Sequence, residues 1–408
     1  MVTSLKNNMS RIRENPWKIV YCLLCLALLA LAAYQFYNLF VIFPPYAQDY
    51  KVFVGAVQAL DHTQNPYLLS NINLYRGAGT LEFVYPPQTL YFFWFLQFLF
   101  IFQNVWIYYT FLGILLIFGS ILLLTLDQKP HYLFLLTLMI TGFISLWWNF
   151  TTGNKDILFL FLFAIIFTLL LTEKYWQSSI VMGLTVGFSL FATPFVALFL
   201  VIRRPIVNRL CYIALSAGIV MILFLVSYCI NASFFYSYIG TLLESNSTLI
   251  QLGGWNAPIP YWLFYDLFRS ISSDAILPTI LVSCAYVGII LYATVNYYKK
   301  HPDDPLKIYA LVLLAVFMLL PRMMPYNFII LVIPLYILFK DVSYQLKILV
   351  LTAISLLPLI VWYLPLFSVN KDELPVFLGP YVQTYSLIIV FFIVILHDNL
   401  SHSVKSDR

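Results

Sequence analysis

The chain has 408 residues, of which 62% are hydrophobic and only 10% are charged, with 22 Lys and Arg against 17 Asp and Glu. Because a soluble domain normally carries about a quarter charged residues, this composition excludes a soluble globular protein. We predict an all-α integral membrane protein with a single polytopic domain over residues 1–408, since the strands of a membrane β-barrel would alternate in hydrophobicity over about ten residues.

A helix needs about 20 residues to cross the hydrocarbon core of a bilayer, which is about 30 Å thick. About twelve apolar segments, with a range of 11–13, are predicted to cross. The first runs from Ile19 to Phe43 and is expected to be retained, because its basic flank is long and no small-residue cleavage site follows. The other predicted spans are residues 88–102, 105–126, 131–149, 154–172, 178–201, 208–230, 276–298, 307–320, 326–339, 346–366 and 381–397.

Lys and Arg in short connections predict the cytoplasmic face, because cytoplasmic loops carry an excess of both. They gather at the N-terminus, in the loops RRPIVNR and YYKKHPDDPLK, and near the C-terminus. Placing them in the cytoplasm leaves two long loops on the outer face, residues 44–87 and 231–275, and a shorter one at 367–380.

The charged loops LDQKPH and LTEKYWQ, in the middle of the chain, fit either face. We prefer the arrangement in which both are cytoplasmic. The segment TTGNKD then lies on the outer face, and some apolar segments are broken or re-entrant. Pro194 in FATPF suits such a break.

Asp49 stands at the start of a predicted amphipathic helix in the first outer loop. The apolar positions of QDYKVFVGAVQAL recur at three- and four-residue steps, at Val52, Phe53, Ala56, Val57 and Leu60. Such a helix is expected to lie along the membrane interface. Asp49 can act as an N-cap that accepts a backbone N–H, or as a base whose pKa is raised by lipid phosphates and apolar walls, and the two roles are compatible.

The rest of this loop carries the motifs NPY, with Tyr67, and FVYPP, with Tyr85. The two prolines after Tyr85 suit the first turn of a helix. Tyrosines at an interface are usually belt residues, an interpretation that does not explain why these motifs share one loop with Asp49. His62 is the loop's single histidine and is kept as a weaker candidate.

The chain offers no pattern for a metal site or a nucleotide fold. Its five cysteines fall in apolar runs and are interpreted as packing residues, and its five histidines show no HExxH or paired spacing. Asp61 is about 18 Å from Asp49 along an unbroken helix, too far to share an ion. We therefore expect no metal, no other cofactor and no nucleic-acid partner.

The order of the motifs resembles glycosyltransferase family 87. The resemblance begins with D-Y-x-V-F-x-x-A-x-x-L, NPY and F-V-Y-P-P, and continues with TTGNKDILFLFLFAI, GLTVGFSLFATPFVALFLVIRR and LLPRMMPYNFIILVIPL. It covers roughly residues 17–340 and depends on order and spacing, since each motif alone is weak. One departure is Thr193, where many members have Lys before the Pro of the paired half-helices.

The resemblance implies a C-type glycosyltransferase that takes a glycosyl residue, with mannose as the best-known case, from a polyprenyl-phosphate sugar. Transfer would proceed with inversion to a lipid- or glycan-linked acceptor on the non-cytoplasmic face, with Asp49 as general base and membrane lipids as surroundings. The compartment would be the plasma membrane in a bacterium or the ER membrane in a eukaryote. The residues expected to bind substrates are Lys51, Tyr67, Arg76, Tyr85, Asn154, Asp156, Asn256, Arg322 and Tyr326.

Several of these residues have a second interpretation. Arg322 is the preferred cation for the leaving phosphate, since an Arg at the membrane edge is costly without a partner, but it can also snorkel to the interface. Asp156 beside Asn154 can bind sugar hydroxyls on the outer face or be a helix-start acid on the inner face. Asn256 and Trp255 suit stacking on a sugar, although turn formation explains them as well.

Two other classes of protein also fit an almost uncharged set of helices. A secondary transporter would show about twelve spans and broken segments, but it should also carry ionisable residues within its spans and internal repeats, which are not apparent here. A non-enzymatic scaffold or a flippase-like lipid handler would not need Asp49. Substitution of Asp49 is expected to discriminate between these classes.

Overall fold

The computed structural model describes residues 16–42, 47–77, 79, 81–126, 130–249, 259–272, 274–320, 323–363, 379 and 381–406. Every regular element within these ranges is a helix, which confirms the predicted all-α class. In chain order they are α2 (Pro16–Tyr37), η1 (Asn38–Ile42), α3 (Gln48–Asp61), α4 (Leu69–Arg76), α5 (Pro87–Phe98), α6 (Val105–Thr125), α7 (Tyr132–Thr141), η2 (Gly142–Ile144), α8 (Ser145–Thr152), α9 (Asp156–Leu171), α10 (Tyr175–Phe188), η3 (Leu190–Val201), α11 (Ile206–Ile230), α12 (Ala232–Leu249), α13 (Pro260–Arg269), α14 (Ile276–Lys300), α15 (Pro305–Leu319), η5 (Pro325–Leu331), α16 (Val332–Phe339), α17 (Tyr344–Leu351), η6 (Thr352–Leu356), α18 (Leu357–Tyr363) and α19 (Val382–Ser406).

The chain is a membrane protein, but the predicted number of about twelve crossings is not confirmed. Six helical stretches of the described residues are long and apolar enough to cross a bilayer. They are Pro16–Ile42, Val105–Thr125, Tyr132–Thr152, Ile206–Ile230, Ile276–Lys300 and Tyr344–Val361. Five further apolar helices have only 10–17 residues, and the predicted span 88–102 contains a helix of 12 residues, because the chain turns after Phe98.

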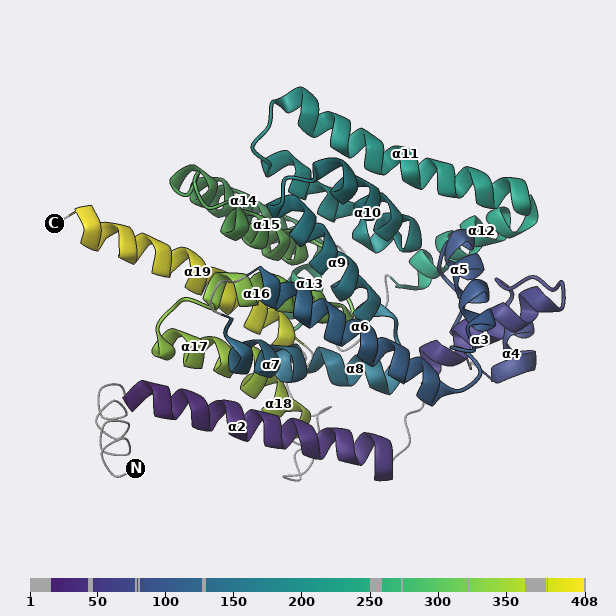
Figure 1. Cartoon of the computed structure of the whole chain (residues 1–408), viewed down its shortest axis with the longest axis horizontal. Helices are drawn as coiled ribbons and strands as arrows, with labels where there is room; N and C mark the ends of the chain where they lie inside the picture. The colour runs from purple at the N-terminus through teal and green to yellow at the C-terminus, as the bar shows by residue number, and fades with distance from the viewer. Residues whose placement is uncertain are drawn as a thin grey trace.

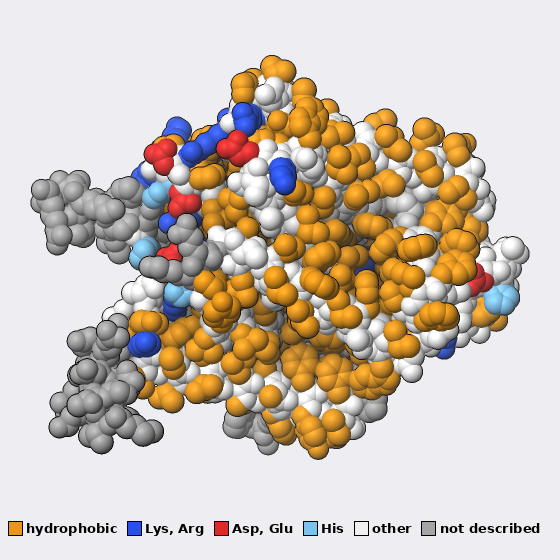
Figure 2. Space-filling model, viewed as in Figure 1, with side chains coloured by type: hydrophobic (Ala, Val, Ile, Leu, Met, Phe, Trp, Pro, Cys, Tyr) orange, Lys and Arg blue, Asp and Glu red, His pale blue; other side chains and the backbone are white. Residues whose placement is uncertain are grey.

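Hydrophobic side chains cover most of the face seen in Figure 2, as expected for a surface that meets lipid. The long helices α11 and α14 have only 11% of their apolar windows buried, and Met221 on α11 is 72% exposed. Helices α9, α15 and α16, in contrast, are largely buried and form the centre of the core. The fold therefore consists of a packed interior surrounded by lipid-facing helices.

The two ends of the helical array differ. The first turn of α2, the last turn of α19 and α17 lie at one end, whereas α3, α4, α5 and α12 lie at the other (Figure 1). Ion pairs at the first end join Arg204 to Glu173 at 2.7 Å and Arg203 to Asp303 at 3.7 Å. Basic side chains gather at this end in Figure 2. Glu173 therefore lies with the basic loops, as in the preferred arrangement of the middle segments.

The predicted break near Pro194 is present, five residues earlier in the chain. Helix α10 ends at Phe188, Ser189 has extended backbone angles (φ −158°, ψ 121°), and the 3-10 helix η3 follows with Pro194 inside it. Proline has no N–H to donate and disfavours an α-helical residue before it, so a continuous helix through residues 178–201 is prevented. The junction at Ser189 forms part of the wall of a cavity described below.

Both predicted outer loops contain helices. Residues 44–87 include α3 and α4, which approach so closely that a Cβ on Gly55 would lie 2.7 Å from Ile72 Cγ2. Residues 231–275 include α12 and α13. The apolar face predicted for residues 48–60 is correct in position but too narrow, since Tyr50, Val54 and Ala59 are also buried. Helix α3 therefore packs against the rest of the protein on more than one face, rather than only along its predicted apolar face.

Candidate functional site

Asp49 lies in the first turn of α3, and its side chain contacts the segment between α8 and α9. The Asp49 Oδ2 atom accepts a 2.8 Å hydrogen bond from Asn154 Nδ2. The predicted N-cap role is wrong, because the N-cap position is Ala47 and no side chain caps the helix. The carboxylate still lies near the positive end of the helix dipole, which favours its ionised form.

A glycine allows this contact. Gly153 ends α8 with φ +71°, a left-handed conformation that favours glycine. A Cβ at this position would lie 2.7 Å from the Tyr50 Cβ and 3.2 Å from the Tyr50 nitrogen. The backbone N–H of Ala47 donates to the Thr151 carbonyl oxygen at 3.1 Å on the same side. Close backbone approach at Gly153 therefore sets the distance between Asp49 and Asn154.

Asn154 and Asn149 connect three parts of the chain. The Asn154 Oδ1 accepts the Asp156 backbone N–H at 3.1 Å, and the Asn154 backbone N–H donates to the Asn149 carbonyl at 2.9 Å. The Asn149 Nδ2 in turn donates to the Tyr326 carbonyl at 3.0 Å. Asp156 Oδ2 accepts a hydrogen bond from the side-chain amide of Asn327. The segments around residues 49, 154 and 327 thus form one polar cluster inside an apolar protein.

Lys155 lies in this cluster and is only 3% exposed. Its Nζ is 3.7 Å from Asp156 Oδ1, 4.0 Å from the centre of the Tyr85 ring and 4.5 Å from the centre of the Phe159 ring. A buried ammonium is costly unless charges and rings compensate it, and this one has both. Lys155 is not among the residues predicted to bind substrates. Its position between two candidates, in GNKD, was the available signal.

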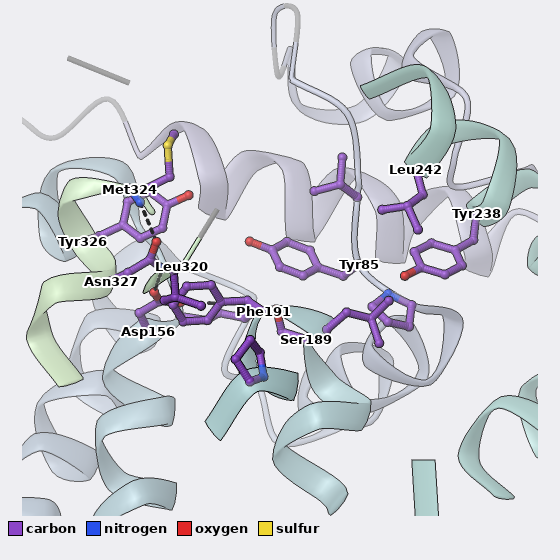
Figure 3. Close-up of a pocket in the computed structure, with 15 residues that line it drawn as sticks. Tyr85, Asp156, Ser189, Phe191, Tyr238, Leu242, Leu320, Met324, Tyr326 and Asn327 are labelled. Atoms are coloured by element: carbon purple, nitrogen blue, oxygen red, sulfur yellow. Dashed lines mark hydrogen bonds and ion pairs between the residues drawn. The ribbon is translucent and has the colours of Figure 1, made fainter. Parts of the chain in front are cut away.

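A cavity of about 260 Å³ opens beside the cluster. Its polar lining comes from Tyr85, Lys155, Asp156, Ser189, Tyr238, Tyr326 and Asn327. Apolar walls include Leu242 of α12 and Leu320 after α15. In Figure 3 the Tyr85 ring lies between the Asp156 and Tyr326 side of the cavity and Tyr238 on α12. The acid and the amide of Asp156 and Asn327 therefore lie on one side of a mainly apolar chamber, and Tyr238 lies on the other.

Tyr85, Asp156 and Tyr326 are the predicted substrate-binding residues among those that line the cavity in the described part of the chain. Asn154 lies behind the wall and holds Asp49, which is half-buried and is not itself in the lining.

Tyr67 has a supporting role. It is 3% exposed, and its hydroxyl donates to the Tyr85 carbonyl oxygen at 3.0 Å, so it positions the segment that carries the Tyr85 ring.

The other predicted residues are not part of this lining. Lys51 is half-buried on α3, and Arg76 is exposed at the last position of α4. His62 is exposed, with Nδ1 2.8 Å from the Gln58 carbonyl oxygen and its ring stacked on Tyr75 at 4.9 Å. These local contacts give His62 a helix-end role. Asn256 and Arg322 lie outside the described residues.

Burial sets the protonation of Asp49. Loss of solvent around the side chain raises the pKa of Asp49 above the usual carboxylate value. Hydrogen bonds from Asn154 and Thr152 and the positive charge of Lys155 act in the opposite direction, with smaller effect. A carboxylate with a raised pKa is a stronger base once ionised, so this group is suited to accept a proton from a hydroxyl.

The described residues contain no group of three or more His, Cys, Asp or Glu side chains that could hold a metal ion. Within the polar cluster, acids are paired with amides and one ammonium. This chemistry fits a polar ligand that carries both hydroxyl groups and negative charge, because amides and acids bind hydroxyls and an ammonium binds anions.

Comparison with known proteins identifies a family. The model of glycosyltransferase family 87 matches residues 83–321, which is more than half of the chain. A search of curated proteins found no match. The matched region includes Tyr85, Asn154 and Asp156, and Asp49 precedes it. The match decides in favour of an enzyme over the transporter, flippase-like and scaffold alternatives.

Proposed function

The chain belongs to glycosyltransferase family 87, and on that premise we propose that it transfers a hexosyl residue, with mannosyl as the first choice, from a polyprenyl-phosphate sugar to a lipid- or glycan-linked acceptor. A glycosyltransferase needs a sugar donor and an acceptor, and the membrane location suits a donor that is anchored in lipid. The acting face is the non-cytoplasmic one, opposite the end where Arg203 and Arg204 lie.

The observation that carries this proposal is the position of Asp49, held by Asn154 next to a small cavity. Pockets for drug-sized ligands have volumes of about 300–1,000 Å³, so a cavity of about 260 Å³ suits one sugar ring with its phosphate. The hydroxyl of Tyr326, the amide of Asn327 and the carboxylate of Asp156 offer partners for sugar hydroxyls. The ring of Tyr85 offers an aromatic face.

The reaction follows from these positions. The acceptor hydroxyl gives its proton to Asp49 as its oxygen forms a bond to the anomeric carbon. The bond between that carbon and the phosphate oxygen breaks, and its electron pair stays on the phosphate. Because attack and departure occur on opposite faces of the sugar, the anomeric configuration is inverted. Asp49 contributes as a general base, worth about 10²- to 10⁴-fold in rate.

The acceptor and the sugar donor reach the site from different sides. Asp49 is half-buried and keeps part of its surface open, whereas Lys155 and Asp156 are almost fully buried. We therefore place the acceptor on the Asp49 side and the donor phosphate inside the cavity. The isoprenoid chain of the bound donor then extends out of the cavity along apolar walls such as Leu242 and Leu320. The membrane is the plasma membrane in a bacterial cell or the ER membrane in a eukaryotic cell.

The test is a donor panel. Protein purified in lipid nanodiscs would be incubated with radiolabelled polyprenyl-phosphate mannose, glucose, galactose and pentoses, with a membrane lipid extract as the source of acceptor. The proposal expects one donor to be consumed and the anomeric configuration of the product to be opposite to that of the donor. Retention of configuration would contradict the base mechanism. Use of a nucleotide-sugar donor alone would contradict the choice of donor.

A further inference from the structure

We infer that the Lys155 ammonium binds the phosphate of the lipid-linked donor and stabilises it as the leaving group. This inference rests on the proposed function, since it assigns a partner to the anion that such a donor carries. It also assigns a role to a buried cation that the general-base mechanism does not use.

The placement of Lys155 is the first argument. Among the described residues that line the cavity, Lys155 is the one Lys or Arg, and it is 3% exposed. Burying a charged group in this position costs free energy, and the cost is acceptable only where an opposite charge or aromatic rings compensate it. Asp156 and the rings of Tyr85 and Phe159 offset this cost, so the lining keeps one cation within reach of a ligand in the cavity.

The partners that Lys155 already has leave room for a ligand. Nζ is 3.7 Å from Asp156 Oδ1, which is longer than an ordinary hydrogen bond. The other oxygen of Asp156 accepts from Asn327. The faces of Tyr85 and Phe159, at 4.0 and 4.5 Å, stabilise the cation without accepting a conventional hydrogen bond. An ammonium has three N–H donors, and a phosphate oxygen in the cavity can accept from them.

The charge changes of the reaction fit this assignment. A polyprenyl-phosphate sugar carries one negative charge on its phosphodiester, and bond cleavage adds a second to the departing oxygen. Before the donor binds, Lys155 is the cation beside two acids, Asp156 and the base Asp49. A cation beside the phosphate therefore gains more interaction as the bond breaks than in the bound donor, which is the condition for lowering the barrier.

Binding of a product-like ligand tests the inference without turnover. The probes are a short-chain isoprenyl phosphate and the matching isoprenol, titrated into protein in nanodiscs of neutral lipid. Wild type is expected to prefer the phosphate. Lys155→Met is expected to reduce phosphate affinity by about 10- to 100-fold, as for loss of one charge-assisted hydrogen bond, and to leave affinity for the isoprenol unchanged. Lys155→Arg is expected to keep most of the preference.

Lys347 provides a matched control. It is also 3% exposed and lies over two rings, Phe134 at 5.5 Å and Tyr344 at 5.7 Å, but it is on α17 at the opposite end from α3 (Figure 1). Lys347→Met is expected to bind both probes as wild type does. If Lys155→Met does not fold, Lys155→Met/Asp156→Asn removes both charges of the pair and is expected to show the same loss.

The outcomes separate this inference from the proposed function. Undiminished phosphate preference in Lys155→Met, or a loss only in Arg322→Gln, would overturn the assignment to Lys155. Wild-type turnover of a polyprenyl-phosphate sugar would in that case leave the proposed function standing. A different result would be that no polyprenyl-phosphate sugar is turned over, while Lys155→Met still loses phosphate binding. Lys155 would then remain an anion-binding residue, and the proposed choice of donor would be overturned.

Discussion

The side-chain amide of Asn154 donates a 2.8 Å hydrogen bond to the carboxylate of Asp49, although 105 positions separate the two residues in the chain. This bond joins the first turn of α3 to the segment between α8 and α9, and Asp156, two residues after Asn154, lines the cavity. Asp49 lies outside the region that matches the family model, and the hydrogen bond holds it beside Asn154, which lies inside that region.

The activity of the wild-type enzyme is expected to rise with pH. Burial raises the pKa of Asp49, and only the ionised carboxylate accepts a proton. Below that pKa the group is protonated and inactive, so the acidic limb of kcat/KM lies at higher pH than for an exposed aspartate. Rates measured from about pH 4 to pH 8 would locate it. A limb at the ordinary carboxylate value, or an identical limb in the residual activity of Asp49→Asn, would contradict the assignment.

Asn154→Ala is expected to move this limb further toward neutral pH. The Asn154 amide stabilises the charged carboxylate and so lowers the pKa of Asp49, and its removal leaves the effect of burial less opposed. In the pH profile of Asn154→Ala, the rate should fall more at pH values below the plateau than on the plateau itself. Asn71→Ala is the control, since Asn71 donates to the Asn65 carbonyl within the predicted first outer loop. An equal loss at every pH would indicate a purely structural role for Asn154.

Gly153→Ala is expected to destabilise the protein by about 1–3 kcal/mol and to lower activity. The new methyl group would meet Tyr50 Cβ at 2.7 Å in a backbone conformation with φ +71°, which pushes α3 away from Asn154. Gly218→Ala, on α11, is the control because nothing lies within 4 Å of the place that its new methyl group would occupy. Thermal unfolding in detergent measures both. Unchanged stability in Gly153→Ala would refute the proposed close approach.

The pair of Lys155 and Asp156 is expected to show strong coupling in a double-mutant cycle. Asp156→Asn keeps an acceptor for Asn327 but leaves Lys155 buried without its counter-charge, which costs about 3–5 kcal/mol. Lys155→Met/Asp156→Asn is expected to lose less than the sum of the two single variants. Unfolding midpoints in denaturant provide the measurement. Additive losses would show that the two charges do not stabilise each other.

Much of the fold was predictable because membrane helices depend on apolar length. The boundaries of α6, α11 and α14 fall within a few residues of the predicted spans 105–126, 208–230 and 276–298. The number of crossings, about twelve, stays a prediction. Short helices such as α5 and the broken pair α10 and η3 depend on turns inside apolar sequence, where hydrophobicity alone gives no boundary.

The site was predictable only in part. Sequence motifs indicate Asp49, Tyr85 and Asp156, but the bond between Asp49 and Asn154 depends on tertiary packing at Gly153. The N-cap expected for Asp49 failed because Ala47 adopts φ 50° and starts the helix earlier. Lys155 was missed because a lysine beside an acid in a loop is normally solvated, and its burial appears only in three dimensions.

The most direct test of the central claim is single-turnover transfer by Asp49→Asn with the donor that the wild-type enzyme consumes, together with the affinity of both proteins for that donor. Asparagine can still accept the hydrogen bond from Asn154 but cannot take a proton. We predict unchanged donor affinity and a rate lower by about 10²- to 10⁴-fold. Transfer at the wild-type rate by Asp49→Asn would show that Asp49 is not the general base.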